Sequence, residues 1–362
     1  MTSGPHHLLA MALVAGSCTG TLDAGQDAPH GLLPVDERNP VIIYNDSSSD
    51  NWMGEYSVLL AESGGPALAG IVITASSYWP AVADNVTGWT NLVSAAESGG
   101  LTNLPAVTTS AGKPLVRPAD GQIGHTTAND SAGAELILSL SRKLGVPARP
   151  VVILAGTQLT DIADAYLVDP TVVDRVVVVA ALGTFTAPNG VMGAPNGELD
   201  PWADWIVAQQ FRYVQVSAFY DQTSDVTTAE IANLPQNALG AEMTAKQPNL
   251  FAITTASDQV SVLSVALDRP QRFATAVRRA VADTSATFDS TQGPPLVPNA
   301  QGNVWIVTQI AAPLAGARLW EMLLGEGSVD AGGAGGASGA GGAPGAGGSP
   351  DGGGAGGAGG AG

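Results

Sequence analysis

The chain is poor in cysteine, in histidine and in basic residues. Its 362 residues include 1 Cys, 4 His, and 14 Lys and Arg against 32 Asp and Glu, so the net charge is −18. A single cysteine excludes a disulfide scaffold and a zinc site built from several thiolates. An acidic protein repels a phosphate backbone, so we expect no nucleic-acid partner. The length allows one large domain or two ordinary ones.

The N-terminal residues predict export. The apolar run 8–15 has the length of a signal-peptide core and is too short to span a bilayer. Residues 14–18 resemble a bacterial lipobox, in which Cys18 is lipidated and becomes the mature N-terminus. Ala15 stands where that pattern prefers a larger aliphatic residue, and no Lys or Arg precedes Arg38. A plain secretory signal or a misassigned start stays an alternative. We expect a cell-envelope lipoprotein or a secreted protein, with a membrane contact only through the lipid.

Glycine is distributed unevenly and marks the end of the folded part. Of the 46 glycines, 18 lie in the last 32 residues, among alanines and without a large apolar side chain. Such a segment cannot offset the entropy of ordering, so it predicts a disordered tail. We therefore expect a signal peptide at 1–18, a linker at 19–38, a folded domain at 39–325 and a Gly/Ala-rich disordered tail at 326–362.

Short β-branched runs alternate with amphipathic stretches in the predicted domain. The runs lie at 41–44, 71–74, 151–154, 176–179 and 214–216. The helical patterns lie at 53–62, 82–97, 132–144, 161–168, 201–211, 272–282 and 313–324. This alternation predicts an α/β fold with an open, mostly parallel sheet and helices on both faces. Ligands bind such folds at the carboxyl ends of the strands.

Two carboxylates and three serines follow the first predicted strand, in residues 45–51. Their position at the carboxyl end of a buried strand makes this loop a candidate site. Asp50 also suits the N-cap of the next helix, and the serine hydroxyls also suit hydrogen bonds to loop amides. The loop therefore supports both a functional and a purely structural interpretation.

Three segments carry a family resemblance. Residues 44–51 read Tyr-Asn-Asp-Ser-Ser-Ser-Asp-Asn, residues 152–163 read Val-Ile-Leu-Ala-Gly-Thr-Gln-Leu-Thr-Asp-Ile-Ala, and residues 196–201 read Asn-Gly-Glu-Leu-Asp-Pro. They resemble, in this order, the Asp-x-Asp-Pro-Gly-x-Asp-Asp, Pro-Thr-Gly-Pro/Gly-Leu-Thr-Asn-Ile-Ala and Asn-x-x-x-Asp-Pro segments of the inosine–uridine nucleoside hydrolase family. Ser257 and Asp258 stand where that family has His-Asp. The resemblance implies the family's fold for nearly the whole domain.

The resemblance also implies a calcium site. In the family, a calcium ion holds a water and the ribose 2′- and 3′-hydroxyls, and an aspartate accepts a proton as the N-glycosidic bond breaks. The ligands correspond to Asp46, Asn51, Gly156 and Asp258, of which Gly156 contributes only its backbone carbonyl. Asp46 also corresponds to the general base, while Asp50 and Asn196 correspond to groups that hold the ribose hydroxyls. Asp258 equally suits a helix N-cap, and Asn196 equally suits an ordinary turn.

Several positions depart from the family pattern. Asn51 and Tyr44 each replace an aspartate near the metal, which predicts weaker calcium binding. Ser257 stands where some members have a histidine that protonates the leaving base, and Ala194 stands where a ribose-contacting acid would lie. Trp79 replaces an asparagine near the ribose, where it suits stacking on a base or sugar, or burial as a packing residue.

Two further features of the core are open to a functional interpretation, and a third, Asp200, is expected to be structural. His125 is the only histidine of the predicted domain, so a Ser-His-Asp triad would need it, although it lies in a polar loop. Trp202 and Trp205 are spaced i, i+3 on a predicted helix, which suits core packing or the lining of a sugar-binding cleft. Asp200 is expected to cap that helix, with Pro201 at its first position.

The first functional hypothesis is an exported, calcium-dependent hydrolase that cleaves the N-glycosidic bond of a ribonucleoside. The second is a non-catalytic protein of the same fold that binds a nucleoside or another carbohydrate. A third is a glycan-directed hydrolase or binding domain that has lost the ribose site. The expected partner is a small nucleoside or sugar, and the family resemblance also implies a homo-oligomer.

Overall fold

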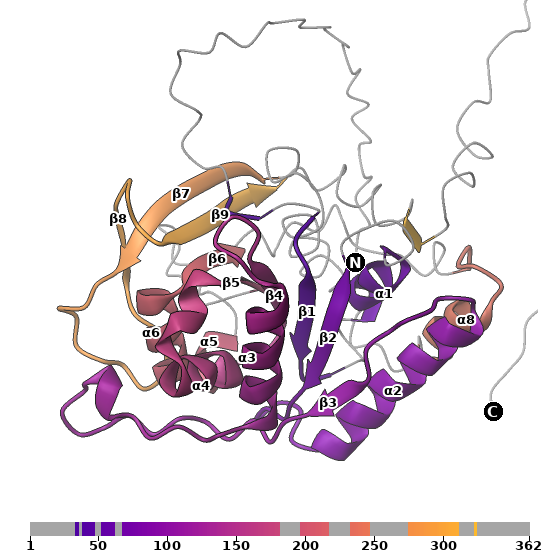
Figure 1. Ribbon diagram of the computed structural model, residues 1–362, viewed down its shortest axis with the longest axis horizontal. Coiled ribbons are helices and arrows are strands. Elements are labelled where there is room, and N and C mark those ends of the chain that lie inside the picture. Colours follow the sequence, from indigo (N-terminus) through magenta and orange to yellow (C-terminus); the bar gives the residue numbers. More distant parts are fainter. Residues whose placement is uncertain are drawn as a thin grey trace, which may run out of the picture.

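The computed structural model describes residues 33–35, 38–47, 52–61, 67–181, 196–216, 232–246, 274–310 and 322–323. A nine-stranded sheet runs through them in the order β3-β2-β1-β4-β5-β6-β9-β7-β8 (Figure 1). The strands are β1 (Val41–Asn45), β2 (Leu68–Ile73), β3 (Val107–Thr109), β4 (Val151–Ala155), β5 (Val176–Ala181), β6 (Arg212–Val216), β7 (Ala274–Ala282), β8 (Leu296–Pro298) and β9 (Val304–Ile310). All pairings from β3 to β9 are parallel, and β7 is antiparallel to both β9 and β8. The predicted mostly parallel sheet is confirmed.

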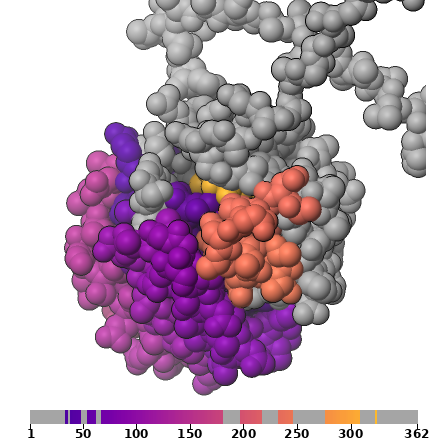
Figure 2. Space-filling view, turned by 90° about the vertical axis from the view of Figure 1, so that its right-hand side faces the viewer, coloured from indigo at the N-terminus to yellow at the C-terminus, as the bar shows by residue number. Residues whose placement is uncertain are grey.

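Helices cover both faces of this sheet. One face carries α1 (Trp52–Ala61), α2 (Val82–Ser98) and α8 (Ala238–Lys246). The other carries α3 (Ala132–Leu144), α4 (Thr160–Val168) and α6 (Pro201–Gln210). Shorter helical turns are η1 (Ile123–His125), η2 (Pro170–Asp174) and α5 (Asn196–Leu199). Helix α8 lies against α2, far from it in the sequence (Figure 2). None of the helices in the described ranges is long and apolar enough to cross a membrane.

The central strands are apolar on both sides because each face packs under helices. Ile43 of β1 faces the cluster under α1 and α2, whereas its neighbour Ile42 faces the cluster under α3 and α4. Two side chains of the predicted linker, Leu33 and Val35, are also buried in the first cluster. The structure therefore places this stretch of the chain in the core.

The segment 272–282, which the sequence pattern predicts as a helix, contains strand β7 instead. The prediction was wrong because the segment pairs along β9, from Ala274↔Ile310 to Ala280↔Val304, and this pairing satisfies its backbone. The Arg279 guanidinium lies 3.9 Å from the ring centroid of Trp305 on β9, which adds a cross-strand contact. Tertiary pairing here overrides a helical periodicity that is shared by many short apolar segments. The other predicted helix, 313–324, lies largely outside the described residues.

Candidate functional site

The candidate site is built at the carboxyl ends of β1, β2 and β4. Asp46 follows β1 directly, and its backbone N–H donates to Asn45 Oδ1 at 2.7 Å. Asn45 in turn donates from Nδ2 to Glu55 Oε1 of α1 at 2.8 Å, and both side chains are buried. The loop after β1 is therefore anchored to the helix that follows it.

The Asp46 carboxylate is buried and oriented by hydrogen bonds. Its Oδ1 accepts the Ser47 backbone N–H at 2.7 Å, and its Oδ2 accepts the Thr157 hydroxyl at 3.0 Å. Only 3% of Asp46 is exposed, and this burial raises the pKa of its carboxyl, while hydrogen bonds from Ser76, Ser47 and Thr157 act in the opposite direction. The arrangement holds a carboxylate in one orientation and raises its basicity, as a general base requires.

Gly156 follows β4 at the same edge of the sheet at which Asp46 follows β1. Tyr44 pairs with Ala155 across β1 and β4, and the Gly156 N–H donates to the Tyr44 carbonyl at 3.0 Å. The two chains leave the sheet together, so residues 46 and 156 become neighbours at its edge. Tyr44 itself is buried in the apolar cluster under α3 and α4, and its hydroxyl accepts the Asp161 N–H at 3.3 Å.

The other residues assigned to the calcium site lie outside the described residues. These are Asn51 and Asp258. The substrate-contact candidate Asp50, the positions Ala194 and Ser257, and the lipidation candidate Cys18 also lie outside the described residues. Within the described part of the chain, no group of three or more His, Cys, Asp or Glu side chains is arranged to hold a metal ion. Asp46 and the Gly156 carbonyl supply oxygen donors, which are the donor type that a hard cation such as calcium prefers. The donor chemistry of these two residues fits the expected ion.

Gln158 ties three loops together at this edge, a role that the sequence analysis did not assign. Its side chain is 1% exposed, and Nε2 donates to the Ala75 carbonyl at 3.1 Å and to the Gly112 carbonyl at 2.6 Å. Gly112 has a φ of +61°, and a Cβ there would meet the Ala75 carbonyl oxygen. Gln158 stands in the turn where the resembled family has proline or glycine, and this departure was the available signal.

Trp79 lies in the loop after β2 with its backbone held on both sides. Its N–H donates to Ser76 Oγ at 3.1 Å, and its carbonyl accepts Asn85 Nδ2 at 3.0 Å. The Trp79 side chain is partly exposed. Its neighbour Tyr78 donates a hydrogen bond to Glu198 Oε1 of α5 at 2.7 Å. This bond joins the Trp79 loop to the helix that begins at Asn196, so two predicted substrate contacts lie on segments that meet.

Three expectations outside this site have clear outcomes. Asp200 caps α6, since its Oδ1 accepts the Ala203 N–H at 3.1 Å, with Pro201 at the first position. Trp202 and Trp205 are buried at 3% and 5% exposure and pack in the core cluster under α3 and α4. Phe288 lies against both rings, with centroid distances of 5.7 Å.

His125 is a surface group. Its Nδ1 lies 2.6 Å from Asp120 Oδ2, and its side chain is 67% exposed. The described hydrogen bonds of this histidine include no serine hydroxyl, so this part of the chain offers no Ser-His-Asp arrangement.

The geometry can be compared with solved structures. A plant nucleoside hydrolase superposes with a TM-score of 0.55 at 15% identity, over 79% of this chain and 99% of its own. The inosine-uridine preferring nucleoside hydrolase from Bacillus anthracis gives 0.55 at 13% identity, over 79% and 99%. An inosine-guanosine nucleoside hydrolase gives 0.55 at 15% identity, over 78% and 98%. The chain has the nucleoside hydrolase fold. At these identities the likeness concerns the fold alone. No protein-family model matches the sequence, and no curated protein does.

Proposed function

We propose that the protein hydrolyses the N-glycosidic bond of a ribonucleoside, with Asp46 as general base. The observation that carries the proposal is the Asp46 carboxyl itself, which lies buried at the carboxyl end of β1 and accepts hydrogen bonds from Ser47 and Thr157. In an open α/β sheet, this edge is where ligands bind. The shared fold with nucleoside hydrolases supports the substrate class.

In the proposed reaction, Asp46 accepts a proton from a water that attacks the anomeric carbon. The new carbon–oxygen bond forms as the carbon–nitrogen bond breaks, and the electron pair of that bond leaves with the base, which takes a proton from solvent. Thr157 holds the Asp46 carboxylate in place. When bound, a calcium ion would acidify the water and orient the ribose hydroxyls. Asp46, Asn51, Gly156 and Asp258 are the proposed ligands, and Asp50, Asn196 and Trp79 the proposed substrate contacts.

The test is ribose release from a panel of ribonucleosides by the full chain, measured as reducing sugar with calcium and after chelation. We expect release that chelation removes. Asp46→Asn should abolish it, and Asp120→Asn, which changes an exposed carboxylate paired with His125, should leave it unchanged. Equal activity in the wild-type chain and Asp46→Asn would refute the proposed mechanism.

A binding protein is the second candidate, and Tyr44 is the observation that favours it. Its phenol is buried among apolar side chains where the resembled family has an acid, which removes one negative charge from beside the proposed metal. Calorimetric titration of the full chain with calcium, then with ribose and inosine, separates the two candidates. Saturable inosine binding without ribose release would support the binding protein.

Export is a further part of the proposal. We expect the mature protein to begin at Cys18 with an attached lipid, or to be secreted after cleavage of the leader. Mass spectrometry of the protein from membranes and culture medium tests this, with Cys18→Ser as the control. Sedimentation analysis of the purified chain tests the expected homo-oligomer.

A further inference from the structure

Five basic side chains gather at the edge of the sheet opposite to Asp46. They lie at the amino ends of β4, β5 and β6, which are neighbours in the sheet. We call this surface the basic face, and it comprises Arg142, Lys143, Arg149, Arg175 and Arg212. Only two carboxylates, Asp169 and Asp174, lie among them in the described segments 142–151, 169–176 and 211–212. A cationic surface on a chain of net charge −18 is a marked separation of charge.

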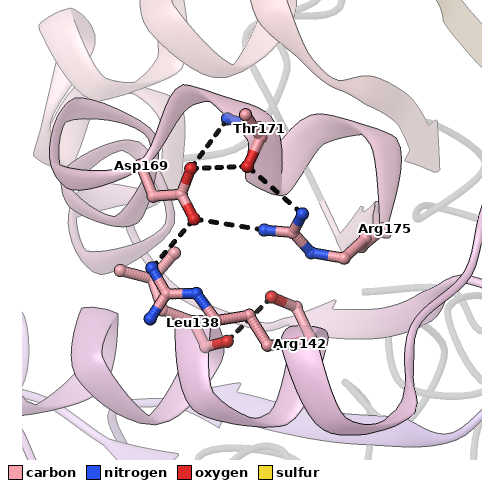
Figure 3. A network of polar contacts seen from close by, with 6 residues as sticks. Leu138, Arg142, Asp169, Thr171 and Arg175 are labelled. Atoms are coloured by element: carbon pink, nitrogen blue, oxygen red, sulfur yellow. Dashed lines mark hydrogen bonds and ion pairs between the residues drawn. The ribbon is translucent and has the colours of Figure 1, made fainter.

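Hydrogen bonds and ion pairs make the basic face continuous. Asp169 Oδ2 lies 2.8 Å from Arg142 Nη2 and 3.2 Å from Arg175 Nη2, so one carboxylate joins two elements (Figure 3). Arg212 donates to the Pro147 carbonyl at 3.2 Å and to the Asp174 carbonyl at 3.1 Å. These contacts hold the loop 145–150, the turn η2 and the start of β6 against one another.

Lys143 and Arg149 are exposed cationic side chains of this surface. Both are solvent-exposed, and neither has an ion-pair partner among the residues that the structure describes. Exposed valines lie beside them: Val146 is 51% exposed and Val168 is 46% exposed. An open groove of about 740 Å³ continues from Val168 and Lys143 along α3 to the start of that helix, where Asp130 and Glu135 also line it, so only its Lys143 end belongs to the basic face. Cationic side chains mixed with apolar ones are typical of surfaces that contact anionic lipid.

The chain passes this surface after its first described residues, Leu33 and Val35, which are buried under α1 and α2. Asn39 Nδ2 donates to the carbonyl of Pro150 at 2.7 Å, directly after Arg149. Cys18 precedes Asn39 by about 20 residues, a length that spans at most ~70 Å when extended. A lipid on Cys18 would therefore hold the domain within that distance of the membrane, and the charge of the basic face would orient it there.

We propose that the basic face rests on an anionic lipid surface and directs the Asp46 site away from it. Each Lys or Arg near such a surface strengthens binding about fivefold. At physiological salt the Debye length is about 8 Å, so the repulsion between the lipid surface and acidic groups at the opposite edge of the sheet is screened. The inference depends on charge and position, so it stands apart from the proposed hydrolysis.

The test uses the full chain carrying Cys18→Ser, which prevents lipidation, in co-sedimentation with vesicles. One vesicle contains phosphatidylcholine and phosphatidylglycerol, and the other contains phosphatidylcholine alone. We expect binding to the first only, weakening as salt rises. Lys143→Glu and Arg149→Glu should each reduce binding about fivefold or more. Lys113→Glu is the matched control, because it makes the same charge change on an exposed lysine of the loop that follows β3, and should have less than half that effect.

Three results would overturn the proposal. The first is absence of binding to the anionic vesicle at low salt. If the protein then binds soluble polyglutamate, an acidic polymer is the partner in place of a lipid surface. The second is equal binding to both vesicles, which would place the contact in the apolar run 8–15. The third is an equal loss for Lys113→Glu and Lys143→Glu, which would indicate an effect of net charge alone.

Discussion

Replacing Asp161 with asparagine is expected to stabilise the protein at neutral pH. Asp161 lies in the first turn of α4 with 1% of its surface exposed, and its Oδ2 has no hydrogen-bond partner among the described atoms. Burial is the largest cause of the raised pKa of this carboxyl, and hydrogen bonds from the Ser110, Ser131 and Tyr44 side chains act in the opposite direction without offsetting it. Asparagine has nearly the same shape and no charge, and it is the residue of the Leu-Thr-Asn-Ile-Ala segment that this stretch resembles.

The expected gain in the free energy of unfolding follows from the cost of an unsatisfied buried polar group, about 1–3 kcal/mol. A raised pKa means that the folded state binds the proton more tightly than the unfolded state does, whose value is close to 3.8. The favourable contribution of Asp161 is therefore complete below that value and is lost as the pH rises through the folded-state pKa. The gain from Asp161→Asn should accordingly be small near pH 4 and full near pH 7.

Thermal unfolding at both pH values is the assay, and the expected rise in Tm at pH 7 is about 2 °C or more. Asp164→Asn is the matched control, since Asp164 lies on the same helix and is fully buried. Its oxygens accept the N–H groups of Asn129 at 2.7 Å and Ser131 at 2.8 Å, so an amide there should destabilise the protein. An unchanged or lower Tm for Asp161→Asn at pH 7, or a gain of equal size near pH 4, would refute the reasoning.

Two more predictions concern the site and its support. Asp200→Ala should cost about 2 kcal/mol or more in urea unfolding, because the carboxylate accepts from Leu115, Thr160 and Ala203; a loss below half of that would assign these bonds little weight. Trp79→Ala should weaken inosine binding in calorimetry at unchanged Tm, whereas unchanged binding with a lower Tm would assign Trp79 to packing.

The order of strands and helices was predictable because it depends on local patterns. Buried parallel strands require β-branched runs such as 176–179, and the helices between them require an apolar stripe, so both periods are visible in the sequence. The wrong helix prediction for residues 272–282 also arises from a local pattern. That segment satisfies a helical period locally, and only its partner β9 decides that it becomes a strand.

The candidate site was predictable only where it depends on strand ends. Asp46 and Gly156 follow parallel strands, and neighbouring parallel strands end at one edge, so their proximity followed from topology. The hydrogen bond between Tyr78 and Glu198 joins segments 120 residues apart, and the two bonds of Gln158 also span distant loops. Such contacts depend on the paths of loops, which leave no periodic signal.

The sequence by itself determined the fold class, because a parallel α/β sheet needs apolar strands and amphipathic helices at regular spacing. It also determined that a carboxylate, Asp46, would follow the first strand. The tertiary structure determined the pKa and the orientation of that carboxylate. Burial raises its pKa, and Thr157, over a hundred positions later in the chain, orients it. The tertiary structure likewise brought Arg142, Arg149 and Arg212 onto one surface. Desolvation and charge grouping depend on distances in space, and a linear chain does not contain those distances until it folds.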